Sequence, residues 1–198
     1  MADMAFSRAR FGRADIRLPD PVPAHPLLDG LPEIGRGEYS IVLALPDGAR
    51  VRKVVSSPAD HFFLTADDRP RGIHFPTVFA DHGVIGRARS GALMHLLELE
   101  RLEPLAAHAE AAAQAERLQT AYWQACLGFA RLGADMGRIA LFHLIESPPP
   151  LPDTLIAALC ALSDFIEAYQ VRPDILSEGN LMARADGTLV FSDPVFLG

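Results

Sequence analysis

A glycine-rich stretch near the start of this chain could bind phosphate. Residues Gly35 to Ser40 follow the pattern G-x-G-x-x-S and stand directly before an apolar run. Glycines at such a turn let backbone N–H groups approach phosphate oxygens without obstruction by side chains. A strand and not a helix is expected to follow, which excludes the Rossmann and P-loop arrangements. Gly35, Gly37 and Ser40 are therefore phosphate-binding candidates, with a simple glycine-rich hairpin turn as the alternative.

The chain contains a single lysine, Lys53, in the next apolar run, Val51–Val55. The other 17 of its 18 basic residues are arginines. A lysine that persists against this bias suggests a role that arginine does not fill, and we predict a point charge directed at phosphates beneath the glycine turn. The alternative is a lysine at a sheet edge that extends its ammonium group into solvent.

Three polar residues near the C-terminus could supply a metal site and a base. Asn180 and Asp193 flank a predicted hairpin, so their side chains are expected to converge at its base. An amide oxygen and a carboxylate are ligands suited to Mg²⁺ held with ATP phosphates. Asp174 precedes Asn180 by six residues and is a candidate to accept a proton from a substrate hydroxyl. The alternative for each of them is a loop cap or turn residue.

The first hundred residues are expected to form a mostly antiparallel sheet with one helix. Pro46-Asp47-Gly48 predicts the turn of a hairpin. Ser57 followed by Pro58 predicts the start of a helix, with Ser57 as its N-cap. The expected strands are 40–45, 49–55, 77–81 and 92–99, with the helix at 58–65 and a loop at 83–91.

The second half is expected to be helical and to end in a hairpin. Apolar residues from Leu118 to Leu132 recur with the period of one helix face, and those from Leu155 to Tyr169 mark another helix capped by Asp153. A proline-rich connector separates the two helices. The final hairpin is predicted from strands at 181–184 and 188–192 around Ala185-Asp186-Gly187.

Composition excludes several classes of protein. With 198 residues and 49% hydrophobic content, the chain can bury a real core. A net charge of −7 argues against nucleic-acid binding, and no apolar run predicts a membrane span or a secretory signal. Cys126 and Cys160 form no disulfide framework, so we expect a cytoplasmic protein. The histidines lack ligand spacing, so the sequence predicts no histidine-ligated metal site.

Taken in order, these pieces resemble the protein-kinase-like fold, most closely that of small, atypical kinase-like proteins of phages and bacteria. The resemblance covers roughly residues 30–195 and includes the run Gly179-Asn-Leu-Met182 and the pair Asp193-Pro194. It implies an α+β, minimal two-lobed protein-kinase-like fold with a truncated C-terminal lobe. The expected parts are an extended leader at 1–28, a β-rich N-lobe at 29–99, and a mostly helical C-lobe at 100–198 with the catalytic loop and hairpin.

The resemblance also implies a role for each candidate residue. Gly35, Gly37 and Ser40 would cover the ATP phosphates, Lys53 would bind the α- and β-phosphates, and the backbone around Glu100 and Leu102 would hold adenine. Asn180 and Asp193 would bind Mg²⁺, and Asp174 would be the base. The kinase glutamate that orients the lysine is absent between Glu38 and Glu98, which leaves Asp60, Asp67 or Asp68 to replace it.

By this resemblance we expect an ATP- and Mg²⁺-dependent phosphotransferase, most simply an atypical protein Ser/Thr kinase with a protein substrate or partner. A pseudokinase that acts as a protein-binding module is the alternative. A small-molecule kinase is a third, weaker one. Neither nucleic acid nor membrane is expected as a partner.

Overall fold

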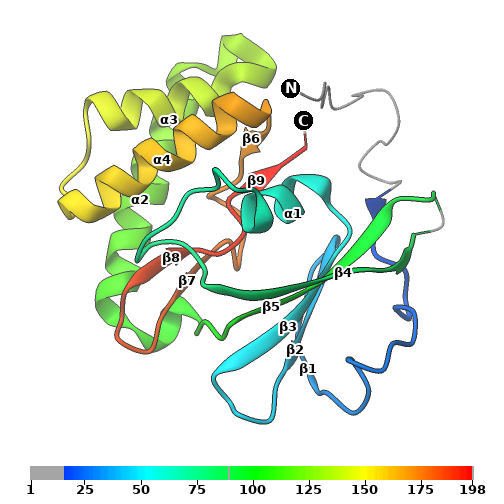
Figure 1. Cartoon of the computed structure of the whole chain (residues 1–198). Coiled ribbons are helices and arrows are strands. Elements are labelled where there is room, and N and C mark those ends of the chain that lie inside the picture. The colour runs from blue at the N-terminus through cyan, green and yellow to red at the C-terminus, as the bar shows by residue number, and fades with distance from the viewer. Residues whose placement is uncertain (1–15, 89, 198) are drawn as a thin grey trace.

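An antiparallel sheet and a group of helices form the two main layers of the computed structural model, which describes residues 16–88 and 90–197 (Figure 1). The sheet has five strands in the order β1-β2-β3-β5-β4. Their bounds are Glu33–Arg36 for β1, Ser40–Ala44 for β2, Arg50–Val55 for β3, Val78–Arg87 for β4 and Leu93–Glu100 for β5. The architecture is α+β, as the sequence predicts.

The β2–β3 hairpin forms where the turn residues predict it. Asp47 Oδ1 accepts hydrogen bonds from the backbone N–H groups of Ala49 and Arg50, both at 3.0 Å. Gly48 has φ +73°, a conformation that other residues rarely adopt. These contacts fix the register in which Val42 lies opposite Lys53.

Strand β4 is longer than the sequence predicts. The loop expected at 83–91 is wrong, because β4 continues to Arg87 and the turn is confined to the residues just after it. The pairing of β4 with β5 contains three register irregularities, and these allow the strand to continue through Gly83 and Gly86. Gly83, with φ +78°, lies in the irregularity between Asp81 and Val84. Bulges of this kind interrupt the regular alternation that identifies a strand in a sequence.

Helix α1 (Pro58–Thr65) begins at the predicted residue, with Ser57 as its N-cap. The remaining helices are α2 (Ala109–Gly128), α3 (Met136–Glu146) and α4 (Asp153–Tyr169), with 3-10 segments at Leu105–Ala107 and Ala130–Asp135. The predicted continuation of one helix to Leu132 is wrong, because α2 ends at Gly128. The predicted cap Asp153 is instead the first residue of α4, where its carboxylate lies in the first turn and favours the helix dipole.

Two short strand pairs complete the C-terminal part. Strands β7 (Leu181–Ala183) and β8 (Leu189–Phe191) form the predicted hairpin. Strand β6 (Arg172–Pro173) pairs with β9 (Val195–Phe196), which follows the hairpin. The segments around Asp174 and Asp193 are therefore held next to each other by backbone hydrogen bonds.

One hydrophobic core joins the sheet to the helices. The inner face of the sheet contributes Val51, Val55, Leu97 and Leu99, which pack in the same cluster as buried residues of all four helices and of β8. Phe63 of α1 packs edge to face on Phe165 of α4, with 5.7 Å between the ring centroids. The two predicted lobes therefore share a continuous core.

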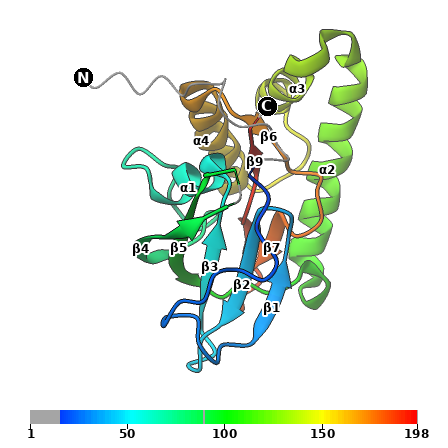
Figure 2. The same cartoon turned by 90° about the vertical axis from the view of Figure 1, so that its right-hand side faces the viewer.

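The outer face of the sheet is covered by the segment that precedes β1. Figure 2 shows this segment crossing the strands from outside. Its apolar residues Leu18, Val22, Leu27, Leu28 and Leu31 pack on a second cluster formed by Ile41, Leu43, Val54, Met94 and Leu96. Residues 1–15 of the predicted leader lie outside the described residues, but the part from residue 16 to 28 belongs to the folded unit.

Among residues 16–88 and 90–197, every helix is too short or too polar to traverse a lipid bilayer.

Ile16 tests how firmly this segment is attached. Its side chain is 2% exposed and packs with Ala88 and Ala92. We expect Ile16→Ala to lower the free energy of unfolding by about 2–4 kcal/mol through lost burial and a residual cavity. Urea unfolding measures this loss. Ile34→Ala is the matched control, because Ile34 is 45% exposed, and equal stabilities of the two variants would show that the segment is not part of the fold.

Candidate functional site

Lys53 is buried in the middle of the sheet. It lies on β3, between β2 and β5, and its side chain points to the inner face and is 8% exposed. Its Nζ lies 3.0 Å from Oδ2 of Asp193, 140 residues further along the chain. The alternative of a solvent-facing lysine at a sheet edge is therefore wrong.

Asp60 is a second acid beside this ion pair. It lies in the first turn of α1 and is 5% exposed, and its backbone N–H donates to the Ser57 hydroxyl at 3.4 Å. Burial, followed by the charge of Asp193, raises the pKa of Asp60 well above its usual range, and Lys53 only partly opposes this. Two carboxylates thus share one ammonium group inside the protein.

The same charges act on Lys53. Burial alone would lower the pKa of Lys53, but Asp193 and then Asp60 outweigh it, so that the pKa is raised. Lys53 is consequently a fixed positive charge at neutral pH. With both carboxylates ionised, the group carries an excess of one negative charge.

The base of the C-terminal hairpin brings the predicted metal ligands together. The backbone carbonyl of Asn180 accepts hydrogen bonds from Ser192 N–H at 2.9 Å and from Asp193 N–H at 3.4 Å. In the described residues, Oδ1 of Asp193 is buried without a hydrogen-bond partner. A buried carboxylate oxygen left without a partner is costly. Asp60 lies within hydrogen-bond reach of Asp193, so a proton on Asp60 or a bound cation would satisfy this carboxylate. Oxygen donors from Asp193, Asn180 and Asp60 suit Mg²⁺.

Asp174 is tied to this cluster through its backbone. Its N–H donates to the carbonyl of Pro194 at 2.7 Å, and its own carbonyl accepts from Asn180 Nδ2 at 2.7 Å. Its carboxylate Oδ1 accepts from the Ser177 hydroxyl at 2.6 Å and from the Ser177 N–H at 3.3 Å. Asp174 therefore caps its own loop beside the predicted metal ligands.

The predicted glycine turn is a tight hairpin between β1 and β2. Gly37 N–H donates to the Ser40 carbonyl at 2.8 Å, and Gly35 is the third residue of β1. An added Cβ would come no closer than 3.8 Å to another atom at Gly35 and 3.7 Å at Gly37, and neither glycine has a positive φ. The backbone conformation at Gly35 and Gly37 therefore does not require glycine. A ligand that packs directly against the backbone would require it, because a side chain there would stand in the way.

Glu100, one of the two residues predicted to bind adenine through their backbone, is the last residue of β5. The Glu100 carboxylate accepts two hydrogen bonds from Arg184, at 2.9 and 2.6 Å, and one from Thr77 N–H at 2.8 Å. Burial would raise the pKa of Glu100, but Arg184 and Thr77 lower it. The side chain of Glu100 thus joins the sheet to the hairpin.

A cavity of about 780 Å³ lies next to this segment and is lined by residues that include Glu100 and Leu102. Backbone N–H groups of Glu100, Arg101 and Glu103 already donate to carbonyls of Thr77, Ala49 and Ala183. Gly35, Gly37, Ser40 and Lys53 do not line this cavity. The structure therefore does not unite the predicted adenine and phosphate sites in one cavity.

The sequence leaves open which acid accompanies Lys53, and the structure selects Asp60. Asp67 and Asp68 are both exposed, and Asp68 accepts a hydrogen bond from the Tyr169 hydroxyl at the surface. A signal for Asp60 is present in the sequence: it lies three residues after the predicted N-cap Ser57, and therefore in the first turn of α1.

No protein-family model matches this chain, and no curated protein matches it. The arrangement of Lys53, Asp60, Asn180 and Asp193 is thus the basis for assigning a function.

Asp60 gives a pH-dependent prediction. Because its pKa is raised in the folded state, the folded protein holds this proton more tightly, and the stability that it contributes is lost as pH rises above about 4 through the folded pKa. Asp60→Asn cannot ionise, so we expect it to be more stable than the wild type at pH 7. Thermal unfolding between pH 4 and pH 8 should show the two proteins diverging as pH rises. Asp67→Asn, at an exposed position, should follow the wild type, and parallel curves for Asp60→Asn would contradict the assignment.

Proposed function

We propose that this chain is an ATP- and Mg²⁺-dependent phosphotransferase with a minimal two-lobed protein-kinase-like fold, acting as an atypical protein Ser/Thr kinase. The observation that carries the proposal is the ion pair between buried Lys53 and half-buried Asp193. It connects the sheet to the C-terminal hairpin, 140 residues apart, beside Asp60 and Asn180.

The charge balance of this cluster favours a ligand-binding role over a structural one. A structural lysine needs one carboxylate, but here a second acid, Asp60, is buried against the first and is destabilising when ionised. Groups that lower stability in this way are typical of functional sites. A divalent cation on the carboxylate oxygens would supply the missing positive charge.

The residues would divide the work of phosphoryl transfer between them. Lys53 would neutralise phosphate charge from the sheet, and the backbone around Gly37 would cover the phosphates. Asp193, Asn180 and Asp60 would hold Mg²⁺, which when bound offsets the charge that develops on the phosphate oxygens. Asp174, the only one of these acids on the loop before Asn180, would accept the proton of the attacking hydroxyl.

A binding module without turnover is the second candidate. One observation favours it: the Asp174 carboxylate already accepts two hydrogen bonds from Ser177, as a loop cap would. Transfer of labelled phosphate from ATP to casein separates the two candidates. Turnover that falls at least 100-fold in Asp174→Asn supports the kinase, and nucleotide binding without turnover supports the module.

Thermal unfolding with ATP tests the nucleotide site. At about 100 times its dissociation constant a ligand adds roughly 2.7 kcal/mol, which for a protein of this size raises the midpoint by roughly 5–10 °C. We expect this shift with ATP and Mg²⁺ together and a much smaller one with ATP alone. In Asp193→Asn the shift should largely disappear, while Asp60 remains as a partner for Lys53 and preserves the fold.

Asp186→Asn is the matched control for that experiment. Asp186 lies at the exposed turn between β7 and β8, where its carboxylate accepts from Thr188 N–H at 2.9 Å, a bond that asparagine can also accept. This variant should keep the full shift. If the wild-type protein shows no Mg²⁺-dependent shift at millimolar ATP, the proposed function is wrong.

Gly37→Ala separates ligand binding from folding. Because the added methyl group meets no close contact and no positive φ, the free energy of unfolding should change by less than about 0.5 kcal/mol. A methyl group in the way of the phosphates should weaken ATP binding at least tenfold, as measured by calorimetry. Gly48→Ala is the opposite control, because φ +73° makes it destabilising without an effect on binding by the folded protein.

A further inference from the structure

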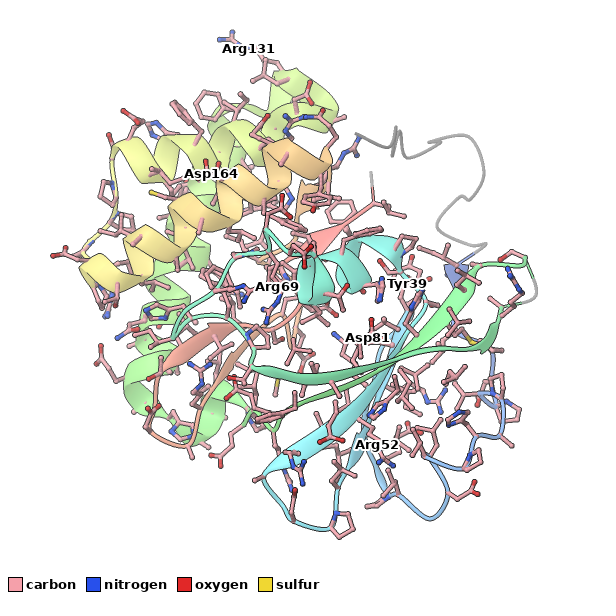
Figure 3. All side chains as sticks on the ribbon, in the orientation of Figure 1. Tyr39, Arg52, Arg69, Asp81, Arg131 and Asp164 are labelled. Carbon is pink, nitrogen blue, oxygen red and sulfur yellow. The ribbon has the colours of Figure 1, made fainter. Side chains whose placement is uncertain are left out.

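Two histidines and an aspartate from three different elements meet between α1 and the sheet. They are His61 of α1, Asp81 of β4 and His95 of β5, and one ligand atom from each lies within 4.8 Å of the others. Figure 3 shows Asp81 on the side of β4 that faces α1. Arg52 lies on the other side of the sheet. None of these three residues of the cluster belongs to the site described above.

The contacts of the cluster leave one ring nitrogen without a partner, while Oδ1 of Asp81 accepts a hydrogen bond from Gly83 N–H at 2.8 Å. Nε2 of His61 lies 3.3 Å from Oδ2 of Asp81. The imidazole rings of His61 and His95 are stacked, with 3.6 Å between their centroids. Nδ1 of His95 is buried and has no hydrogen-bond partner in the described residues. An unpartnered buried ring nitrogen beside a second imidazole and a carboxylate is unexplained by packing alone.

We propose that His61, Asp81 and His95 form a binding site for a divalent transition-metal ion, with zinc as the ion that fits best. Two imidazole nitrogens and one carboxylate oxygen are a common ligand set for zinc, with a water molecule in the fourth position. Asp81 has a side chain that is 37% exposed, so the ion can reach the site from solvent. The inference does not depend on the proposed function.

Binding requires one ring to turn. The two ring planes are 26° apart, and nearly parallel rings do not direct their nitrogen lone pairs to one point. A rotation of His61 about its Cβ–Cγ bond would break this stacking, which binding of both rings to one ion requires.

The site would attach α1 to the two strands. His61 directly follows Asp60, so a metal ion on His61 would fix the helix that carries the buried acid beside Lys53. Within the described chain, the other contacts of the His61 ring are stacking and edge contacts with aromatic rings. Coordination would replace these with bonds of defined direction.

Zinc titration of the full, tag-free chain after treatment with a chelator tests the proposal. Calorimetry should show one tight equivalent of Zn²⁺, and Co²⁺ in its place should give visible absorption bands of a tetrahedral site. Asp81→Asn and His95→Ala should each weaken the binding at least tenfold. Asp81→Asn should fold normally, because the Asp81 side chain is exposed and asparagine has nearly the same shape as aspartate. Weaker zinc binding by this variant would therefore reflect the lost ligand and not a folding defect.

His82→Ala is the matched control. His82 is the neighbour of Asp81, but its Nε2 lies 3.7 Å from Oε2 of Glu98 instead, so this variant should bind zinc like the wild type. Asp193→Asn should also keep zinc binding, which separates this site from the nucleotide site. The proposal is overturned if the wild type binds no zinc, or if Asp81→Asn and His95→Ala both bind it as tightly as His82→Ala.

Discussion

The ion pair of Lys53 and Asp193 is the contact that ties the C-terminal hairpin to the middle of the sheet. An ammonium group in the middle of a sheet is tolerated only with a partner, and its partner comes from the end of the C-terminal hairpin. The hairpin is in turn held by β6 and β9, and by Arg184 at the Glu100 carboxylate. Separation of the sheet from the hairpin would therefore leave buried charges unpaired.

Local patterns in the sequence predict the elements that are built from contacts between near neighbours. The β2–β3 and β7–β8 hairpins and the start of α1 follow from turn glycines and from Ser57, and the structure confirms them. The second half of strand β4 and the break between α2 and α3 are missed, because the bulges in β4 and the kink at Gly133 interrupt the periodic patterns from which elements are predicted.

The candidate sites show the same division. Lys53, Asn180 and Asp193 attract notice through residue type and order, but their mutual distances are set by the core that joins the sheet and helices. The cluster of His61, Asp81 and His95 has no signature at all in the sequence, since each residue comes from a different element. Only the pairing of β4 with β5 and the packing of α1 bring the three together.

The two ends of the described chain meet at one place. Ile16 lies in a small cluster with Ala88 and Ala92, and Leu197 packs against the same cluster. Closely spaced ends are the condition for circular permutation, so a short peptide from residue 197 to residue 16 would close the chain into a ring. Such a ring could be reopened at the exposed turn of Asp47 and Gly48, which would leave the strand order of the sheet intact.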